Sequence, residues 1–339
     1  MPARLKDIAK DLDLSVVTIS KVLRDHPDIS QETRQRVLKR MKELNYRPNL
    51  AARALVTGRS YIAGLVVPDL VHPFFGQVAK GLSQGLRKKG YSLVLSSSED
   101  DPELERQEIE LLLARRVDVL IVASTQSDLE TFQRLTELKV PYVLIDRRFE
   151  GLAANFVGVD DGAVGALATA HLIDVGCRRI AHIGGPNVST ALGRRDGYLR
   201  ALANRGMTAV PELTEMRGHG DDAGDASGYR TMQRLLALDT PPDGVFCFND
   251  PTAMGAMKAV LEAGKRVPED VAIVGCGNVA YSDFLRIPLT SVDQQSDGIG
   301  EHTANMAMAL LENGASSRPK TVLLEPQLVV RASTIRRQE

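Results

Sequence analysis

Apolar side chains recur at helical spacing through the first 46 residues of the chain. The apolar face of a first predicted helix consists of Leu5, Ile8, Ala9 and Leu12. Ser15 is a suitable N-cap for a second helix that ends at Leu23, and Ser30 for a third over residues 31–44. Two helices of about eight residues joined by so short a turn must cross steeply, as in a helix-turn-helix. A generic three-helix bundle is the alternative that this pattern leaves open.

The exposed start of the second helix is the part of a helix-turn-helix that enters the major groove of DNA. Its residues here are Val16, Val17, Ser20 and Lys21. Valine side chains contact thymine methyl groups but donate no hydrogen bond, whereas a lysine can reach a guanine edge or a phosphate. We therefore expect a DNA site that is recognised partly through thymine methyl groups.

From Ile62 onward, short strand-like apolar runs alternate with helical stretches. The predicted strands begin at Ile62, Tyr91, Val117, Tyr142 and Phe156, and a second series begins at Ile180, Val245 and Val271. This alternation is typical of parallel sheets covered by helices on both faces, so we expect an α/β core of two doubly wound subdomains. A last strand-rich piece, residues 321–330, must return to one of them.

The predicted organisation is a head over residues 1–46, a hinge helix and linker over 47–60, and a core over 61–339. The first subdomain is expected to comprise residues 61–162 with 290–322, and the second residues 163–289 with 323–339. Ligands of open parallel sheets bind beyond the carboxyl ends of the strands, so a site is expected in the cleft between the subdomains.

Charge separates the two parts of this 339-residue chain. Residues 1–60 carry 13 Lys and Arg against 7 Asp and Glu, a net charge of +6, and the remainder carries −7. A basic module on an acidic body indicates a polyanionic partner for the first part only.

The chain offers no constellation typical of an enzyme or a metalloprotein. Cys177, Cys247 and Cys276 lie far apart, and the six histidines lack metal-ligand spacing. We expect three buried thiols in a reducing cytoplasm, with no catalytic role, no metal and no cofactor. The N-terminal residues do not form a signal peptide, and the apolar runs are too short to span a bilayer. A free-standing sugar receptor would carry a signal peptide in place of the basic head.

Motifs along the whole chain resemble those of the lactose-repressor (LacI/GalR) family. In the head and hinge they are Leu5-Lys-Asp-Ile-Ala, Ser15-x-x-Thr18-Ile-Ser20-Lys-Val-Leu23, Leu44-Asn-Tyr-x-Pro-Asn49 and Ala52-Arg-Ala-Leu55. In the core they are Val67-Pro-Asp-Leu, Pro73-Phe-Phe, Arg194-x-x-Gly197-Tyr, Phe248-Asn-Asp250, Val267-Pro-Glu-Asp-Val271 and Val274-Gly-x-x-Asn278. The resemblance implies a homodimeric transcription regulator that acts as a repressor and has a periplasmic-binding-protein-like core.

The resemblance also gives residues 47–60 a function. A helix this short is marginal alone in water. In the family it orders when two copies meet on a palindromic operator, and a leucine matching Leu55 wedges into the minor groove. The resemblance thereby implies DNA contacts from Leu5, Ser15, Thr18, Asn49, Ala52, Arg53 and Leu55, in addition to those of the second helix. The bound protein is then expected on the bacterial nucleoid.

In the cleft, the resemblance implies ligand contacts from Phe74, Phe75, Asp161, Thr190, Arg194, Asn249, Asp250 and Gln294. Three alternatives remain open from the residues. Phe74 and Phe75 could cap the core instead of contacting ligand, Arg195 competes with Arg194, and Asp250 could cap the helix that Pro251 enters.

Two departures from the family pattern concern the effector, for which a sugar or sugar derivative is the first expectation. Gly277 stands where the family usually has Asp, and Ala223 where it usually has an aromatic residue. Loss of a carboxylate and a ring suggests a ligand other than a simple hexose. A regulator of nucleoside or purine type, or one that needs no effector, is the alternative.

Overall fold

The computed structural model describes residues 4–23, 26–46, 54, 57–217, 224–313 and 318–336. Two compact units meet between Ser60 and Tyr61. They are called the head, residues 1–60, and the core, residues 61–339. Asn49, Ala52, Arg53 and Leu55 of the predicted hinge lie outside the described residues, as does Ala223.

The head contains three short helices packed around a small apolar centre. They are α1 (Leu5–Leu12), α2 (Val16–Leu23) and α3 (Gln31–Glu43). The fully or nearly fully buried side chains are Ile8, Ala9, Ile19, Val22, Val37 and Met41. Asp13 takes a left-handed conformation, φ 53°, in the turn between α1 and α2, a geometry that Asp tolerates at modest cost. Leu23, the last residue of α2, is 36% exposed and lies outside this centre.

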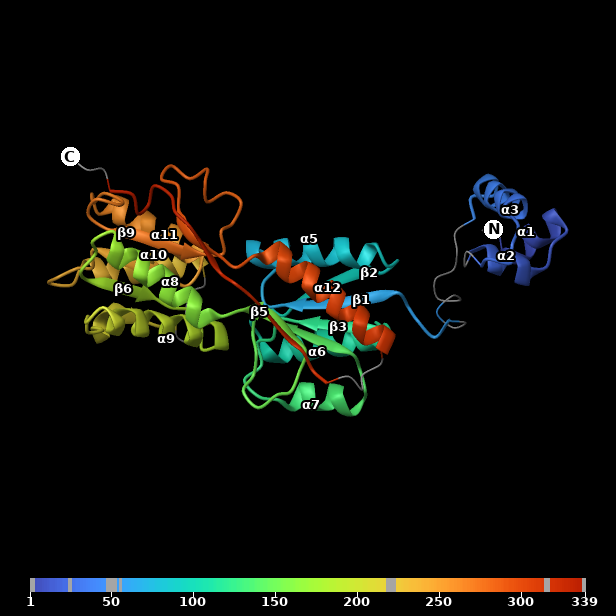
Figure 1. Ribbon diagram of the computed structural model, residues 1–339, viewed down its shortest axis with the longest axis horizontal. Helices are drawn as coiled ribbons and strands as arrows, with labels where there is room; N and C mark the ends of the chain where they lie inside the picture. The colour runs from blue at the N-terminus through green and yellow to red at the C-terminus, as the bar shows by residue number, and fades with distance from the viewer. Residues whose placement is uncertain are drawn as a thin grey trace. The chain divides into compact units, whose positions relative to one another are not determined.

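The first subdomain of the core is built on a parallel sheet, drawn near the centre of Figure 1. Within the described residues it has six strands in the order β11-β5-β4-β3-β1-β2. They are β1 (Ile62–Val67), β2 (Ser92–Ser97), β3 (Val119–Val122), β4 (Tyr142–Ile145), β5 (Phe156–Val159) and β11 (Thr321–Leu324). Its helices are α5 (Pro73–Arg87), α6 (Pro102–Ala114), α7 (Glu130–Glu137) and α12 (Ser296–Asn313).

Alternate residues of β1 face different helices, as the period of a strand requires. Ala63, Leu65 and Val67 pack in the cluster that contains the buried side chains of α5 and α12. Val66 packs with Ile109 and other side chains of α6 and α7. Both faces of the sheet are therefore covered, which explains why its strands read as continuous apolar runs.

The second subdomain has the same layered construction. Its sheet, in the part of the chain that is described, has the order β12-β10-β9-β8-β6-β7, and only β12 is antiparallel to its neighbour. The strands are β6 (Ile180–Ile183), β7 (Thr214–Glu215), β8 (Gly244–Cys247), β9 (Ala272–Cys276), β10 (Thr290–Asp293) and β12 (Gln327–Val329). The helices are α8 (Asp161–Asp174), α9 (Ser189–Asn204), α10 (Gly224–Leu236), α11 (Asp250–Glu262) and the 3₁₀ turn η1 (Pro211–Leu213).

Two boundaries between the subdomains lie at other residues than predicted. We expected residues 290–322 in the first subdomain, but β10 pairs with β9 in the second, so the crossing lies between Asp293 and Ser296. Residues 321–330 do not return to a single sheet, because they give β11 to the first and β12 to the second. The register of β11 with β5 continues to Leu324, past the predicted boundary at 323.

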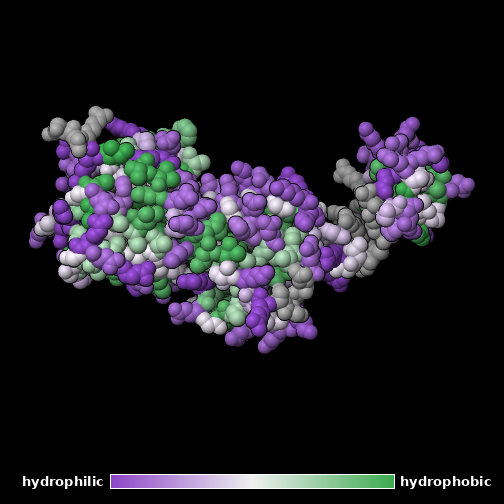
Figure 2. All heavy atoms as spheres, in the orientation of Figure 1, coloured by the Kyte–Doolittle hydropathy of each residue, from purple (hydrophilic) through white to green (hydrophobic). Residues whose placement is uncertain are grey.

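The drawn face of the molecule carries both hydrophilic and apolar side chains. Hydrophilic side chains cover most of the face drawn in Figure 2, while apolar side chains also reach the surface over the subdomain that contains α10 and α11. The three cysteines are free and buried. None of the described helices is long and apolar enough to cross a membrane.

Candidate functional site

The start of α2 is exposed on the head. The hydroxyl of Ser15 accepts a hydrogen bond from the backbone N–H of Thr18 at 2.9 Å and so caps the helix. Val16 is 39% exposed and Val17 62% exposed. Both valines therefore keep part of their apolar surface open to an outside partner.

The other predicted DNA contacts of the head have partners within it. The ammonium of Lys21 lies 3.2 Å from a carboxylate oxygen of Asp28, and Ser20 is half-buried. Leu5 is half-buried and packs against the apolar centre. The DNA contacts predicted for these residues and for Ser15, Val16, Val17 and Thr18 stay predictions, as do those of Asn49, Ala52, Arg53 and Leu55, which lie outside the described residues.

A cavity of about 790 Å³ lies in the core and is lined by both subdomains. Its size falls within the range of small-molecule sites. It opens beyond the carboxyl ends of strands in both sheets, at the place where open parallel sheets bind their ligands. Of the residues predicted to contact a ligand, those that line the cavity are Phe74, Phe75, Arg194, Asn249 and Gln294. Asp161, Thr190 and Asp250 are absent from its lining.

Arg194 is held rigidly in the cavity wall. It is 3% exposed, and its Nε donates to Asp161 Oδ1 at 3.0 Å while Nη1 donates to the carbonyl of Phe248 at 2.8 Å. Its guanidinium also lies 4.7 Å from the centroid of the Phe248 ring. Burial opposes the charge, but the carboxylates of Asp161 and Asp146 raise the pKa of Arg194 above its ordinary value, so the side chain stays cationic.

Close packing of α8 on α9 sets this geometry. A side chain on Gly165 would collide with the backbone carbonyl of Arg194, and one on Gly197 with the carbonyl of Gly162. The two helices therefore approach closely enough for Asp161, at the start of α8, to reach Arg194 in the second turn of α9. Arg194 thus lies inside α9, which begins at Ser189. Arg195 lies on the outer side, with Asp196 as its partner.

Asp250 is buried inside the second subdomain, where its carboxylate holds neighbouring segments together. It is completely buried and accepts hydrogen bonds from the backbone N–H of Val279, at 2.8 Å, and from the hydroxyls of Ser282 and Ser291. These bonds tie the start of α11 to β10 and to the loop after β9, which contains Gly277 at φ 126°. The cap of α11 is Asn249, whose Oδ1 accepts from the N–H of Thr252 at 2.9 Å, and not Asp250.

The aromatic pair at the start of α5 serves the core and the cavity together. Phe74 is 3% and Phe75 7% exposed, and both belong to the main apolar cluster. Their rings meet edge to face with centroids 5.1 Å apart. Each also contributes to the cavity lining. Only a narrow part of either ring is therefore accessible to a ligand.

Of the charged residues that line the cavity, only Arg194 was predicted from the sequence. Those that were missed include Asp100, Asp146, Arg147 and Arg217. Asp146 and Arg147 follow β4 directly, so their position after a buried strand was a usable signal. Arg217 follows β7, whose two residues are too few to produce a strand pattern. Asp100 lies in the loop after β2, at φ 57°.

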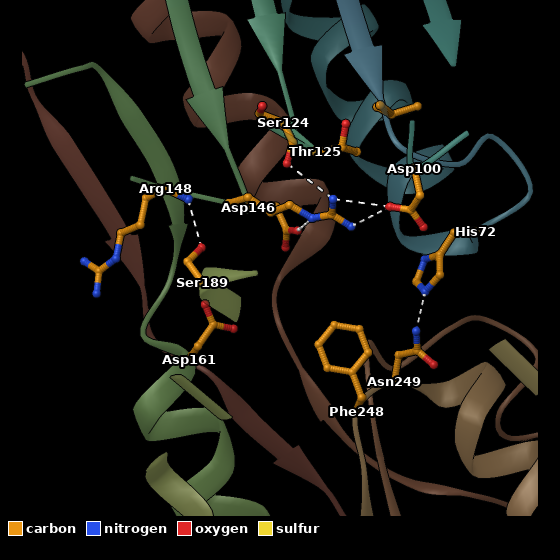
Figure 3. Close-up of polar contacts among 12 residues, drawn as sticks. His72, Asp100, Ser124, Thr125, Asp146, Arg148, Asp161, Ser189, Phe248 and Asn249 are labelled. Atoms are coloured by element: carbon orange, nitrogen blue, oxygen red, sulfur yellow. Dashed lines mark hydrogen bonds and ion pairs between the residues drawn. The ribbon is translucent and has the colours of Figure 1, made fainter. Parts of the chain in front are cut away.

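Polar contacts between described residues join the two subdomains across the cleft. Asn249 donates through Nδ2 to His72 Nε2 at 3.0 Å, and the backbone N–H of Arg148 donates to the hydroxyl of Ser189 at 3.0 Å. Both are drawn in Figure 3. In the third contact, Arg217 Nη2 lies 3.4 Å from Asp100 Oδ2. The cleft therefore has matched polar groups on opposite walls.

The burial of His72 predicts that the folding stability of the core depends on pH. Burial lowers the pKa of His72 to about 4, below its unfolded value of about 6.5, so between these values the unfolded chain binds more protons and stability falls as pH falls. We expect this histidine to remove up to about 2 kcal/mol of stability between pH 7 and pH 5. Urea unfolding of the wild type and of His72→Gln at both pH values checks this, because the variant should lose that part of the dependence. Equal pH dependence of the two proteins would contradict it.

Comparison with known proteins places the chain in a family. The pattern "Bacterial regulatory proteins, lacI family" matches residues 4–49, and "Periplasmic binding protein-like domain" matches residues 169–334. The HTH-type transcriptional repressor PurR of Pasteurella multocida (strain Pm70) is 32% identical over 335 residues, which are 98% of each chain. The chain belongs to the lacI family of bacterial regulatory proteins.

Solved structures agree with this membership of the lacI family. The chain is similar to the lac repressor dimer bound to operator and the anti-inducer ONPF, with a TM-score of 0.87, 26% identity and coverage of 99% and 100% of the two chains. It is also similar to a complex of the transcriptional regulator CelR with cellobiose, with a TM-score of 0.73, 30% identity and coverage of 98% and 99%. The lacI-family chain is thus a DNA-binding transcriptional regulator with a helix-turn-helix head and a periplasmic-binding-protein-like core.

Proposed function

We propose that the protein is a repressor that binds a palindromic operator as a homodimer and responds to a sugar or sugar derivative in the cleft of its core. The observation that carries this proposal is a cavity lined by both subdomains, in the same chain as a head with an exposed α2. Relatives named as transcriptional repressors, and a similar structure solved on operator DNA, support it. The protein then acts by binding, without a catalytic step.

Each head supplies one recognition helix, so a two-fold symmetric operator requires two copies of the chain. The start of α2 lies in the major groove of each half-site, with Val16 and Val17 against the bases. Residues 47–60 cross the minor groove between the half-sites, and Leu55 is the wedge that opens it. Lys21 exchanges its partner Asp28 for phosphate or a guanine edge.

Control by the effector follows from the position of the cleft. A ligand that contacts both walls changes the angle between the subdomains and thereby the separation of the two chains' residues near Tyr61, where the hinges begin. The coupling is reciprocal, so the ligand changes DNA affinity by the factor by which DNA changes ligand affinity.

Selection of bound DNA from a random duplex library tests the proposal. The full chain should enrich a palindrome, and affinity for it should fall about 10³-fold or more between 50 and 200 mM salt if six or more phosphates are neutralised. Sedimentation of the complex should give two chains per duplex. Enrichment of sites without two-fold symmetry, or a flat salt dependence, would overturn the proposal.

Thymine methyl groups in the selected half-sites should contribute to binding. Replacing a contacted thymine with uracil removes one methyl group, which is worth about 0.8 kcal/mol and hence about fourfold in affinity. Fluorescence anisotropy with wild type and Val17→Ala measures the effect.

The valine variant makes this a test of contact. If Val17 covers the methyl group, Val17→Ala should bind thymine and uracil duplexes more equally than the wild type does. An unchanged affinity of the wild type after uracil replacement at every half-site thymine rules out the assignment.

A further inference from the structure

One carboxylate serves two arginines across the cleft. Asp100 Oδ1 lies 3.3 Å from Nη2 of Arg147, in the first subdomain, and its Oδ2 lies 3.4 Å from Nη2 of Arg217, in the second. The side chains of Arg147 and Arg217 are only 10% and 15% exposed, whereas Asp100 is 38% exposed. Two largely buried positive charges therefore share one partially exposed negative charge, at distances longer than good charge-assisted hydrogen bonds.

The nearby Asp146 does not supply the missing negative charge to Arg147. Its Oδ2 is 3.9 Å from Arg147 Nε, too far for a hydrogen bond, and Nε has no hydrogen-bond partner among the described residues. Burial raises the pKa of Asp146, which disfavours its charged form. Buried guanidinium groups are costly unless a close anion compensates them. This part of the wall is thus built for an additional negative charge.

Other cavity-lining groups also lack acceptors. The Oδ1 of Asn249 accepts from the N–H of Thr252, so its Nδ2 donates to Nε2 of His72. A neutral His72 must then carry its proton on Nδ1, and this atom has no partner among the described residues. Nε2 of Gln294, a residue only 4% exposed, is a second buried donor without a partner in the described chain. These unpaired donors favour a ligand that is rich in hydrogen-bond acceptors.

The aromatic residues favour a sugar over a nucleobase. The guanidinium of Arg194 lies over the Phe248 ring, and Phe74 and Phe75 are nearly buried. Of these three rings little face is left on which a flat base could stack. The cavity is also lined by Tyr229, whose ring has the Lys258 ammonium over it, and by Tyr281, which is 40% exposed. A hydroxylated ring can use such an edge together with the polar wall.

We propose that the effector is an anionic sugar derivative, with its carboxylate or phosphate bound between Arg147 and Arg217 and its hydroxyl oxygens accepting from His72 and Gln294. This inference rests on the proposed control by a cleft ligand. The incoming anion lies beside Asp100 and supplies the additional negative charge between the two arginines. Because the arginines belong to different subdomains, the anionic group of the ligand sets the separation of the cleft walls directly.

Calorimetric titration and thermal shift of the full chain with matched ligands test the proposal. The probes are glucose with gluconate, glucuronate and glucose 6-phosphate, galactose with galacturonate, ribose with ribose 5-phosphate, and adenosine, guanine and inorganic phosphate. An anionic sugar should bind at least about 100-fold more tightly than its neutral parent, because charge-assisted hydrogen bonds to two guanidiniums are lost in the parent. The carboxylate and phosphate arms distinguish the two anionic groups, and phosphate alone should bind weakly.

Variants at Arg217 test the contact itself. Arg217→Gln should weaken the binding of the anionic sugar about 10- to 100-fold, through loss of one charged partner, while Arg217→Lys should restore part of it. Arg234→Gln is the matched control, because Arg234 is exposed and pairs with Glu215 away from the cavity lining. Its ligand affinity should equal that of the wild type. Thermal unfolding of each variant identifies a protein that fails to fold.

Neutral sugars or nucleobases that bind as well as the anionic sugars would overturn the inference, and so would the absence of binding by every anionic sugar in the panel. DNA binding by the same preparation separates this failure from that of the proposed function. A protein that binds a palindromic duplex and responds to a neutral compound remains an effector-controlled repressor. One that binds no palindrome contradicts the proposed function.

Discussion

Replacement of Arg194 with leucine is expected to lower the free energy of unfolding of the core by about 3–5 kcal/mol, the cost of breaking a buried ion pair. Arg194 is 3% exposed and donates to Asp161 Oδ1 and to the Phe248 carbonyl. Leucine leaves the buried carboxyl group of Asp161 without its cation and leaves the carbonyl of Phe248 without its donor. Urea unfolding of the full chain, followed by far-UV circular dichroism, measures the change.

A control and a second variant make the measurement specific. Arg195→Leu alters the next residue, whose side chain is 36% exposed and pairs with Asp196, so its stability should lie within about 0.5 kcal/mol of the wild type. Asp161→Asn in the Arg194→Leu background should recover part of the loss, because the unpaired charge is removed. If Arg194→Leu and Arg195→Leu unfold at the same urea concentration, the buried pair does not stabilise the core.

Replacement of Ile19 with alanine should abolish high-affinity DNA binding while leaving the core intact. Ile19 is completely buried in the head, and such a truncation costs about 2–5 kcal/mol. A domain this small has little stability to lose. Because only folded heads bind, operator affinity should fall at least about 100-fold. Fluorescence anisotropy on the selected duplex measures it.

Leu38→Ala is the matched control for Ile19→Ala. It shortens an apolar side chain of similar size in the same domain, but Leu38 is 50% exposed on α3, so DNA affinity should stay near that of the wild type. The thermal transition of the core should be unchanged in both variants. Tight binding by Ile19→Ala would mean that the head does not depend on this apolar centre.

Local patterns were sufficient for most elements of the fold. The helices of the head were predicted from apolar spacing and from the caps Ser15 and Ser30, because both signals act within one turn of helix. The strands of the core were predicted because buried parallel strands are apolar on both faces. Thr290–Asp293 gave no such signal, since three of its four residues, Thr290, Ser291 and Asp293, are polar and hydrogen-bonded to distant groups.

The site was less accessible to sequence reasoning. Arg194 could be anticipated because its motif resembles the family's, but the choice between it and Arg195 depends on how closely α8 approaches α9. The sharing of Asp100 by Arg147 and Arg217 could not be anticipated, because these residues follow three different strands in two subdomains. Such contacts depend on tertiary approach, which carries no period or spacing along the chain.

The position of β11 and β12 bears on how the protein is made. These strands complete opposite sheets, yet they lie together between Thr321 and Val329. During synthesis, each sheet therefore waits with an unpaired edge until the ribosome has added these residues. Such edges are prone to pair with other chains. The two sheets thus receive their last strands at nearly the same point of synthesis.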